Sequence, residues 1–189
     1  LYYEFRDLTP LGRPGDVMIQ HLADRLAGVD LLDRAASLLQ HQVTYRLEKE
    51  ERSRVGARLA LIYLLNREPD KTLETLELTG YGENDAQLTL KRNHLAALAQ
   101  AKLGSWQRAL NLLRDDFSAE AKLIRADIYW DNKDWSNVAK TVEDMMAARR
   151  DITAQLSDDE TQALLKMAVA YTFNQETDQL QYLRDYFLP

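Results

Sequence analysis

The sequence contains no cysteine, which excludes structural disulfides and thiolate chemistry in any compartment. It has only three histidines, His21, His41 and His94, and none has a second histidine or a cysteine at ligand spacing. We therefore expect no metal site and interpret each histidine as a surface or half-buried helical residue. Long apolar runs are also missing, so we expect no membrane span, and no signal peptide is recognisable.

The motifs of common enzyme sites are missing as well. There is no serine nucleophile elbow and no glycine-rich phosphate loop, and Gly80-x-Gly82 is too short to count as one. The neighbouring carboxylates Asp115-Asp116 and Asp158-Asp159-Glu160 precede expected helices, where capping explains them better than acid–base catalysis. We expect no enzymatic activity and no cofactor.

Net charge is almost absent from the first part of the chain and strongly negative in the last, where basic residues are few. The net charge of the 189 residues is −6. Residues 1–114 carry 16 basic and 15 acidic side chains, whereas residues 115–189 carry 8 basic and 15 acidic ones, a net charge of −7. An acidic surface argues against a nucleic acid or an anionic membrane as partner. A solvated helical exterior explains most of the remaining charges.

The pattern that is present is a repeated pair of short helices, clearest in residues 54–113. In its first copy, apolar residues share one helical face, a break follows, and a second apolar helix comes after the break. The positions concerned are Leu59, Ala60, Tyr63, the break at Glu68-Pro69, and then Thr72, Leu73 and Leu76. In the second copy Gly104 can adopt the left-handed conformation that ends a helix. One such hairpin cannot bury its apolar face alone, so the pattern predicts a solenoid of stacked hairpins.

This order of residues resembles the tetratricopeptide repeat. The small residue that marks each copy is Ala23, Ala60, Ala97, Ala126 and Ala168 in turn. These marker alanines lie 37, 37, 29 and 42 positions apart, against roughly 34 in the family, and the family's first-helix Trp and terminal Pro are absent. The resemblance implies an all-α, right-handed superhelix of about five helix-turn-helix hairpins, and a segment of a longer bacterial repeat protein.

We expect a single domain over residues 1–189, in which an irregular segment, 1–15, precedes the hairpins. The five hairpins are expected at roughly 16–47, 50–79, 85–114, 118–149 and 158–188. The expected helix N-caps are Asp16, Asp85, Ser118 and Ser157, the last within a capping box. Trp106 and Trp135 each follow a turn by two positions, and we expect both in the core.

In tetratricopeptide solenoids the first helix of each pair lines a concave groove, and the resemblance carries that face onto this chain. The expected groove residues are Arg54, Arg58 and Leu61, then Lys91, His94, Leu98 and Lys102, then Leu123, Asp127, Trp130 and Asp131. A groove that is basic in its middle and acidic beyond suits an extended peptide of mixed charge with an apolar anchor. The family's carboxylate clamp needs an Asn where Leu61, Leu98 and Asp127 stand, so we do not expect binding of chaperone tails.

These observations favour a non-catalytic protein–protein interaction module that binds a protein or peptide segment. A first alternative is a structural spacer or self-association segment of a larger repeat protein, in which Tyr182, Tyr186 and Phe187 contact a second copy. A second alternative is a small-molecule sensor or enzyme accessory domain, which requires a closed pocket. The compartment stays open between the cytoplasm and the periplasm.

Overall fold

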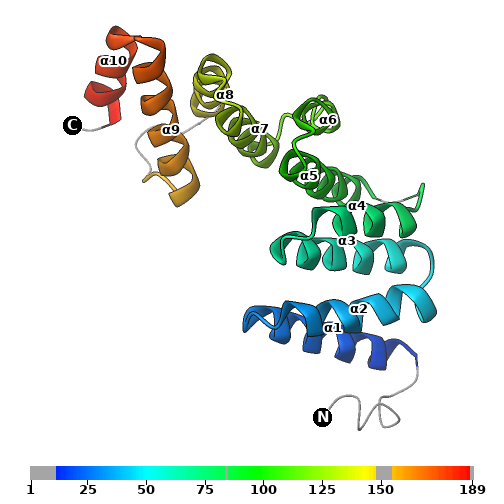
Figure 1. The fold of residues 1–189 in the computed structure, drawn as a ribbon. Helices are drawn as coiled ribbons and strands as arrows, with labels where there is room; N and C mark the ends of the chain where they lie inside the picture. Colours follow the sequence, from blue (N-terminus) through cyan, green and yellow to red (C-terminus); the bar gives the residue numbers. More distant parts are fainter. Residues whose placement is uncertain (1–11, 84, 148–154, 188–189) are drawn as a thin grey trace. The chain divides into compact units, whose positions relative to one another are not determined.

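The computed structural model describes residues 12–83, 85–147 and 155–187, with the side chains of Tyr186 and Phe187 excluded. Within these residues the chain forms ten α-helices and no strand, which confirms the all-α class (Figure 1). The helices are α1 (Arg13–Gly28), α2 (Leu32–Tyr45), α3 (Lys49–Leu65), α4 (Pro69–Leu78), α5 (Ala86–Lys102), α6 (Trp106–Leu112), α7 (Ala119–Asp131), α8 (Trp135–Ala147), α9 (Asp158–Asn174) and α10 (Thr177–Phe187). None of the helices in this described part has the length and apolar character that a membrane crossing requires.

The five helix pairs close with the same turn. In each turn one residue with a left-handed backbone lies two positions before the second helix begins, namely Asp30, Arg67, Gly104, Lys133 and Gln175, with φ between 57° and 76°. In the turn between α3 and α4, the N–H of Glu68 donates to the carbonyl of Tyr63 at 2.8 Å. Equivalent bonds of 2.9 Å close three other turns, from Leu31 to Leu26, from Asp134 to Tyr129 and from Glu176 to Tyr171. This is the closing bond of a Schellman motif.

The structural repeat has the same register as the sequence repeat. Each left-handed residue follows its marker alanine by seven positions, from Ala23 to Asp30 at the start and from Ala168 to Gln175 at the end. The first four marker alanines have exposed fractions between 0% and 2%, because a small side chain lets neighbouring helices approach closely. Ala168 is only half-buried.

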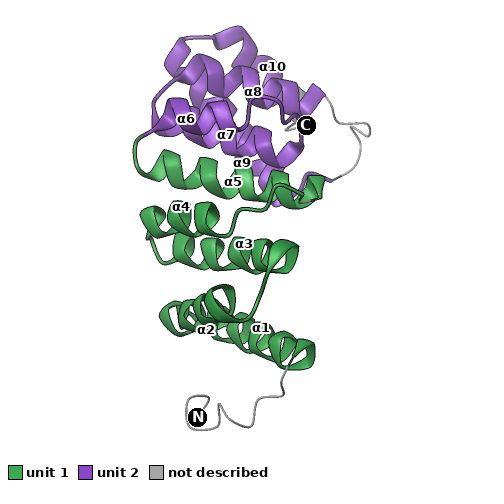
Figure 2. Ribbon diagram, turned by 90° about the vertical axis from the view of Figure 1, so that its right-hand side faces the viewer, with its two compact units in different colours: residues 1–104 green, residues 105–189 purple. Residues whose placement is uncertain are grey.

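The chain divides into two compact units, residues 1–104 (unit 1) and 105–189 (unit 2), where the sequence pattern predicts one domain (Figure 2). In unit 1, α3 packs against α2 and α4, and α5 packs against both α3 and α4. In unit 2, α9 packs against α8, α7 and α10. The first helix of the third hairpin, α5, and that of the fifth, α9, therefore each pack against both helices of the preceding hairpin.

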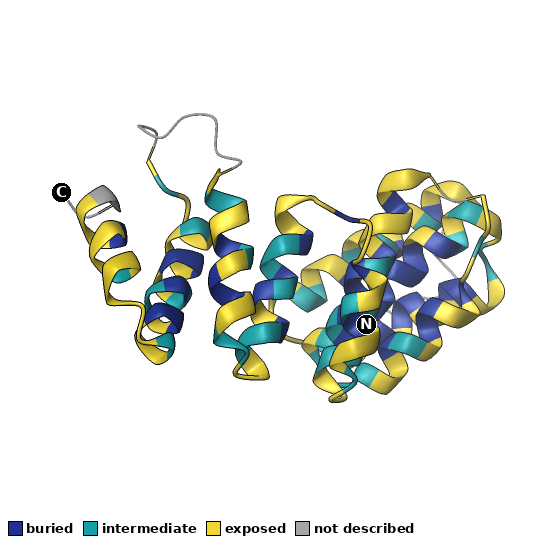
Figure 3. Ribbon diagram, turned by 90° about the horizontal axis from the view of Figure 1, so that it is seen from above, coloured by how far each residue is buried: buried dark blue, intermediate teal, exposed yellow. Residues whose placement is uncertain are grey.

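The buried residues lie on the faces where helices meet (Figure 3). In unit 1, one cluster joins α1, α2 and α3, and includes Ile19, Leu39 and Leu59. A second cluster joins α3, α4 and α5 through Ala57, Ala60, Leu76, Leu88 and Leu95. In unit 2, one cluster joins α7, α8, α9 and α10 through residues such as Val138, Val142, Met167 and Leu183.

A buried arginine ties three helices of unit 1 together. Arg92 on α5 is 9% exposed, and burial lowers the pKa of its guanidinium. Its Nη1 donates to the carbonyl of Ser53 on α3 at 2.8 Å and to Thr79 Oγ1 at 3.3 Å, and its Nη2 donates to the carbonyl of Leu76 on α4. All three acceptors are neutral, so these bonds are not ion pairs. Two of the acceptors lie at the C-terminal end of α4, where helical carbonyls lack partners within the helix, and the third lies in the N-terminal half of α3.

Three of the four expected N-caps are observed, and the first helix is the exception. Asp85, Ser118 and Ser157 each accept a bond from a backbone N–H of the first turn, as expected, and Ser157 forms a complete capping box. Asp16, however, is not an N-cap, because α1 already begins at Arg13 with Pro14 in its first turn. The expected irregular segment, 1–15, therefore ends earlier than predicted, and residues 1–11 lie outside the described part.

Trp106 is not a core residue, contrary to the sequence-based expectation. It is 38% exposed, whereas Trp135 is half-buried and packs against the core of unit 2. Trp106 is the first residue of α6, a helix of only seven residues. Trp135 is likewise the first residue of α8, so position in the helix does not separate the two. The neighbours do, because the rings of Trp130 and Phe173 lie against Trp135.

Candidate functional site

Two of the four basic residues expected in the groove of unit 1 form ion pairs with carboxylates. Arg54 is exposed and forms ion pairs with Glu50 at 2.5 Å and Glu51 at 3.0 Å on its own helix. Arg58 forms an ion pair with Asp24 of α1 and also donates to Gln20 at 3.1 Å. The α1 residues that hold Arg58 lie more than thirty positions away in the sequence, and the helical pattern gave no signal for this contact.

The expected groove positions on α5 differ in exposure. Lys91 and Lys102 are exposed and Leu98 is half-buried, as is Leu123 on α7, while Leu61 on α3 is 37% exposed. His94 is 5% exposed, so it is neither a surface residue nor a groove residue. The reason is its place on the helix, three positions before the marker alanine Ala97, on the side that the helix buries.

In unit 2 the expected acidic end of the groove is also partly neutralised. Asp127 forms an ion pair with Lys166 of α9, while Asp131 is exposed. Trp130, expected as an apolar anchor in the groove, instead packs against the core of unit 2. Its ring lies edge-on to that of Trp135, with centroids 5.3 Å apart. Trp130 is therefore held by protein contacts and is at most half available to a ligand.

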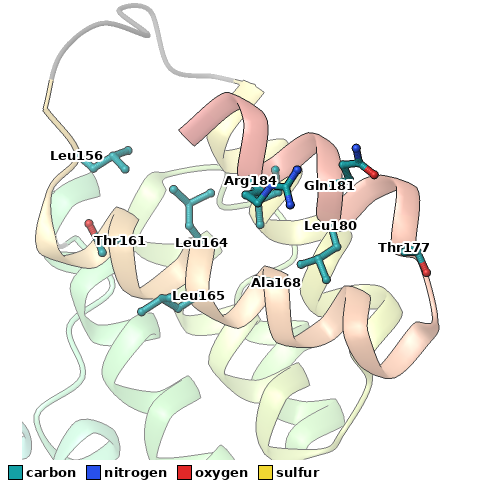
Figure 4. Close-up of a pocket in the computed structure, with 10 residues that line it drawn as sticks. Leu156, Thr161, Leu164, Leu165, Ala168, Thr177, Leu180, Gln181 and Arg184 are labelled. Atoms are coloured by element: carbon teal, nitrogen blue, oxygen red, sulfur yellow. The ribbon is translucent and has the colours of Figure 1, made fainter. Parts of the chain in front are cut away.

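A better-defined site lies between α9 and α10, where a cleft has a volume of about 450 Å³ (Figure 4). Each helix contributes one face, at positions i, i+3, i+4 and i+7. From α9 come Thr161, Leu164, Leu165 and Ala168, and from α10 come Thr177, Leu180, Gln181 and Arg184, joined by Leu183 and Leu156. The cleft is therefore two helical turns long and mainly apolar.

The floor and the rim of this cleft differ in character. Leu164 and Leu183 are 7% and 9% exposed and form part of the packed core beneath it. Leu165 stands on the rim and is 63% exposed. Arg184, the charged residue among those that line the cleft, forms a solvent-exposed ion pair with Asp185 at 3.0 Å. The site thus offers apolar contact surface and one cationic group.

The repeat register explains why this cleft exists. Counting from the marker alanines Ala60 and Ala168, Leu165 stands where Ala57 does in the second hairpin, and Arg184 stands where Leu76 does. In unit 1, Ala57, Ala60 and Leu76 are covered by Leu88 and Leu95 of α5. The corresponding face of α9 and α10 has no such helix over it among the described residues, which leaves Ala168 half-buried and the cleft open.

An apolar stripe continues from the cleft along α9. Leu165, Val169 and Phe173 are spaced four positions apart and are 63%, 38% and 60% exposed. Phe173 stacks on Trp135 with ring centroids 4.7 Å apart and an interplanar angle of 12°. Sequence reasoning missed Leu165 and Phe173. The available signal was that Leu165 and Phe173 lie off the apolar face that Leu164, Met167, Ala168 and Tyr171 form on this helix.

Titratable groups with shifted pKa values lie outside the cleft. Tyr171 is 3% exposed and donates to Glu143, and both its burial and this bond raise the pKa of its hydroxyl. In the described residues, no three His, Asp or Glu side chains are grouped so that they could hold a metal ion. The arrangement is therefore suited to apolar contact and charge pairing.

Comparison with protein-family models, curated proteins and solved structures finds no match to this chain. Function is accordingly argued from the geometry of the chain. The cleft between α9 and α10 is the strongest starting point, because its lining has a covered counterpart within the same chain.

Proposed function

We propose that the chain is a non-catalytic binding module with a right-handed, tetratricopeptide-like superhelix, and that it binds a helix of a protein partner in the cleft between α9 and α10. The repeated turn and the constant register of the marker alanines support the solenoid part of this proposal. The observation that carries the binding part is the correspondence of Leu165 and Ala168 with Ala57 and Ala60, which α5 covers in unit 1.

The covered counterpart specifies the kind of helix that fits. Leu88 and Leu95 of α5 are seven positions apart, which places them on one face, two turns from each other. A partner helix should therefore present apolar side chains at this spacing, a known mode of helix-in-groove recognition. Because Arg184 replaces the apolar Leu76, the partner should also place an acidic side chain beside it.

The test uses a fluorescein-labelled helical peptide of 17 residues with leucines at positions 3 and 10, a lysine-free polar face, and a glutamate placed toward Arg184. Binding is measured by fluorescence anisotropy. We expect Leu165→Lys to weaken binding at least tenfold, because it places a charge on the apolar rim. Leu65→Lys is the matched control, since Leu65 is 58% exposed and Leu165 is 63% exposed, and it should change binding less than twofold.

A charge swap separates specific docking from nonspecific adhesion. Arg184→Glu should weaken binding of the glutamate peptide, and a peptide with lysine at that position should restore it. If the wild-type chain fails to bind the peptide, or if Leu65→Lys and Leu165→Lys weaken binding equally, docking in this cleft is refuted. Sedimentation velocity tests the self-association alternative. A dimer that Leu165→Lys dissociates would show that a second copy occupies the cleft.

A further inference from the structure

Unit 2 contains a second pocket, of about 350 Å³, between α6, α7 and α8. Three basic side chains line it, Arg114 from the end of α6 and Lys122 and Arg125 from α7. Asp144 from α8 also lines it, and so does Phe117, which is 77% exposed. The volume lies in the range of sites for small ligands.

The three cations are held in place by neutral acceptors. Arg125 Nη1 donates to the carbonyl of Leu113 at 2.7 Å, and Lys122 Nζ donates to the backbone carbonyl of Asp144 at 3.0 Å. Arg114 Nη2 donates to the side-chain oxygen of Asn111 at 2.9 Å. Each side chain keeps further N–H donors beyond the bond that positions it. Their orientation is thus set without neutralising their charge.

Within the described residues, none of these three cations forms an ion pair. Lys166 and Arg184 of the same unit pair with carboxylates, and what distinguishes Arg114, Lys122 and Arg125 is that all three line one pocket. Residues 105–189 carry 10 basic and 15 acidic side chains, so carboxylates are in excess in this unit as a whole. Three unpaired cations in one pocket of an acidic unit indicate a site that attracts an anion from solution.

We infer that this pocket binds a phosphate monoester with an apolar organic part. The three cations and the carboxylate of Asp144 together give a local charge of about +2, and a phosphate monoester carries a charge of about −1.5 to −2 at neutral pH. Arginine offers paired N–H groups that match phosphate oxygens. Phe117 and Leu110 on the wall of the pocket provide contact surface for the organic part.

This inference goes beyond the proposed function, because the pocket and the cleft between α9 and α10 share no lining residue. It assigns unit 2 a ligand site for a small anion in addition to a docking site for a helix. Failure of one site in experiment therefore leaves the other untouched.

The test is a titration of the complete chain with phenyl phosphate, inorganic phosphate and benzoate, followed by ¹H–¹⁵N NMR. Phenyl phosphate should bind tightest, with shifts centred on α6 and α7. Inorganic phosphate should bind more weakly because it cannot contact Phe117, and benzoate should bind more weakly because it carries only one charge. If inorganic phosphate binds as tightly as phenyl phosphate, the pocket takes free phosphate and the inference about an organic part is refuted.

The variants separate the pocket from the general charge of the chain. Arg114→Ala should weaken phenyl phosphate binding at least fivefold, whereas Arg108→Ala, which removes an exposed cation of α6 that does not line the pocket, should change it less than twofold. Asp144→Asn should tighten binding at least twofold, because it removes the one negative charge of the lining and keeps the carbonyl that holds Lys122. Phe117→Ala should weaken binding of phenyl phosphate but not of inorganic phosphate.

Two results would overturn the proposal. The first is the absence of phosphate-dependent shifts in the wild-type chain at millimolar ligand. The second is an equal loss in Arg114→Ala and Arg108→Ala, which would show that binding follows the net charge and not the pocket. Far-UV circular dichroism of each variant checks that the helices remain intact. The tighter binding expected for Asp144→Asn also cannot arise from a folding defect, because a folding defect would weaken binding.

Discussion

Gly56→Ala tests a close approach in unit 1, between α3 and Thr79 at the end of α4. Gly56 lies in α3, where alanine should be favoured over glycine by about 1 kcal/mol from helix propensity alone. A Cβ atom at this position, however, would lie within 2.7 Å of three side-chain atoms of Thr79. Helix propensity therefore predicts that Gly56→Ala raises the free energy of unfolding, whereas packing predicts that it lowers it.

Packing should win because Thr79 cannot move easily. It is 2% exposed, its Oγ1 donates to the carbonyl of Thr75 at 2.6 Å, and the same oxygen accepts a bond from Arg92. Overpacking in a close-packed interior costs roughly 1–3 kcal/mol, and a rigid neighbour places this case near the upper end. After the propensity gain, we expect a net destabilisation of about 2 kcal/mol.

The measurement is urea unfolding followed by far-UV circular dichroism. With a slope of about 2 kcal/mol per molar urea, the midpoint should fall by about 1 M. Gly28→Ala is the matched control, since Gly28 also lies in a helix but a Cβ atom there has no neighbour within 4 Å. In a Thr79→Gly background, Gly56→Ala should no longer destabilise the chain. A Gly56→Ala variant as stable as the wild type would refute this account of the interface.

Two further predictions concern aromatic residues. Trp135→Ala should lower the free energy of unfolding by about 3 kcal/mol, because the ring contacts Trp130 and Phe173, and Trp106→Ala should cost clearly less in the same urea assay. If Trp106→Ala lowers the free energy of unfolding as much as Trp135→Ala or more, Trp106 is part of the core. Because the pKa of Tyr171 is raised in the folded chain, the unfolded chain releases this phenolic proton first, near pH 10. The contribution of the Tyr171 hydroxyl to the free energy of unfolding is therefore complete below pH 10 and is lost as pH rises above it. Tyr171→Phe should therefore flatten the alkaline decline of stability, measured by urea unfolding between pH 9 and 11, and an unchanged slope would exclude Tyr171 as its source.

Local features of the fold could be predicted from the sequence because short-range chemistry determines them. The marker alanines and the breaks near Asp30, Glu68, Gly104 and Lys133 were correctly placed, since apolar periodicity and turn residues act within one helix pair, whereas the fifth turn at Gln175 was not predicted. The capping box at Ser157 is equally local. The first helix start was wrong because Pro14 initiates α1 before Asp16 can cap it.

The candidate sites depended on contacts that no local pattern contains. Arg58 could be assigned to a groove face from its position in α3, but its partner Asp24 comes from another hairpin, and the ion pair changes what the face offers. For the same reason, His94 could be placed on α5 but not recognised as buried.

The sequence by itself determined the all-α class, the five helix pairs and the register of their small residues, because each depends on residues within a few turns of one another. Only the tertiary structure decided which faces stay open. Leu165 and Ala57 are equivalent in the repeat, but α5 covers Ala57, whereas Leu165 lines a cleft. Likewise, Arg114, Lys122 and Arg125 form one pocket only because α6, α7 and α8 meet there. The physical reason is that helix formation is local, whereas burial and charge pairing depend on which helices become neighbours.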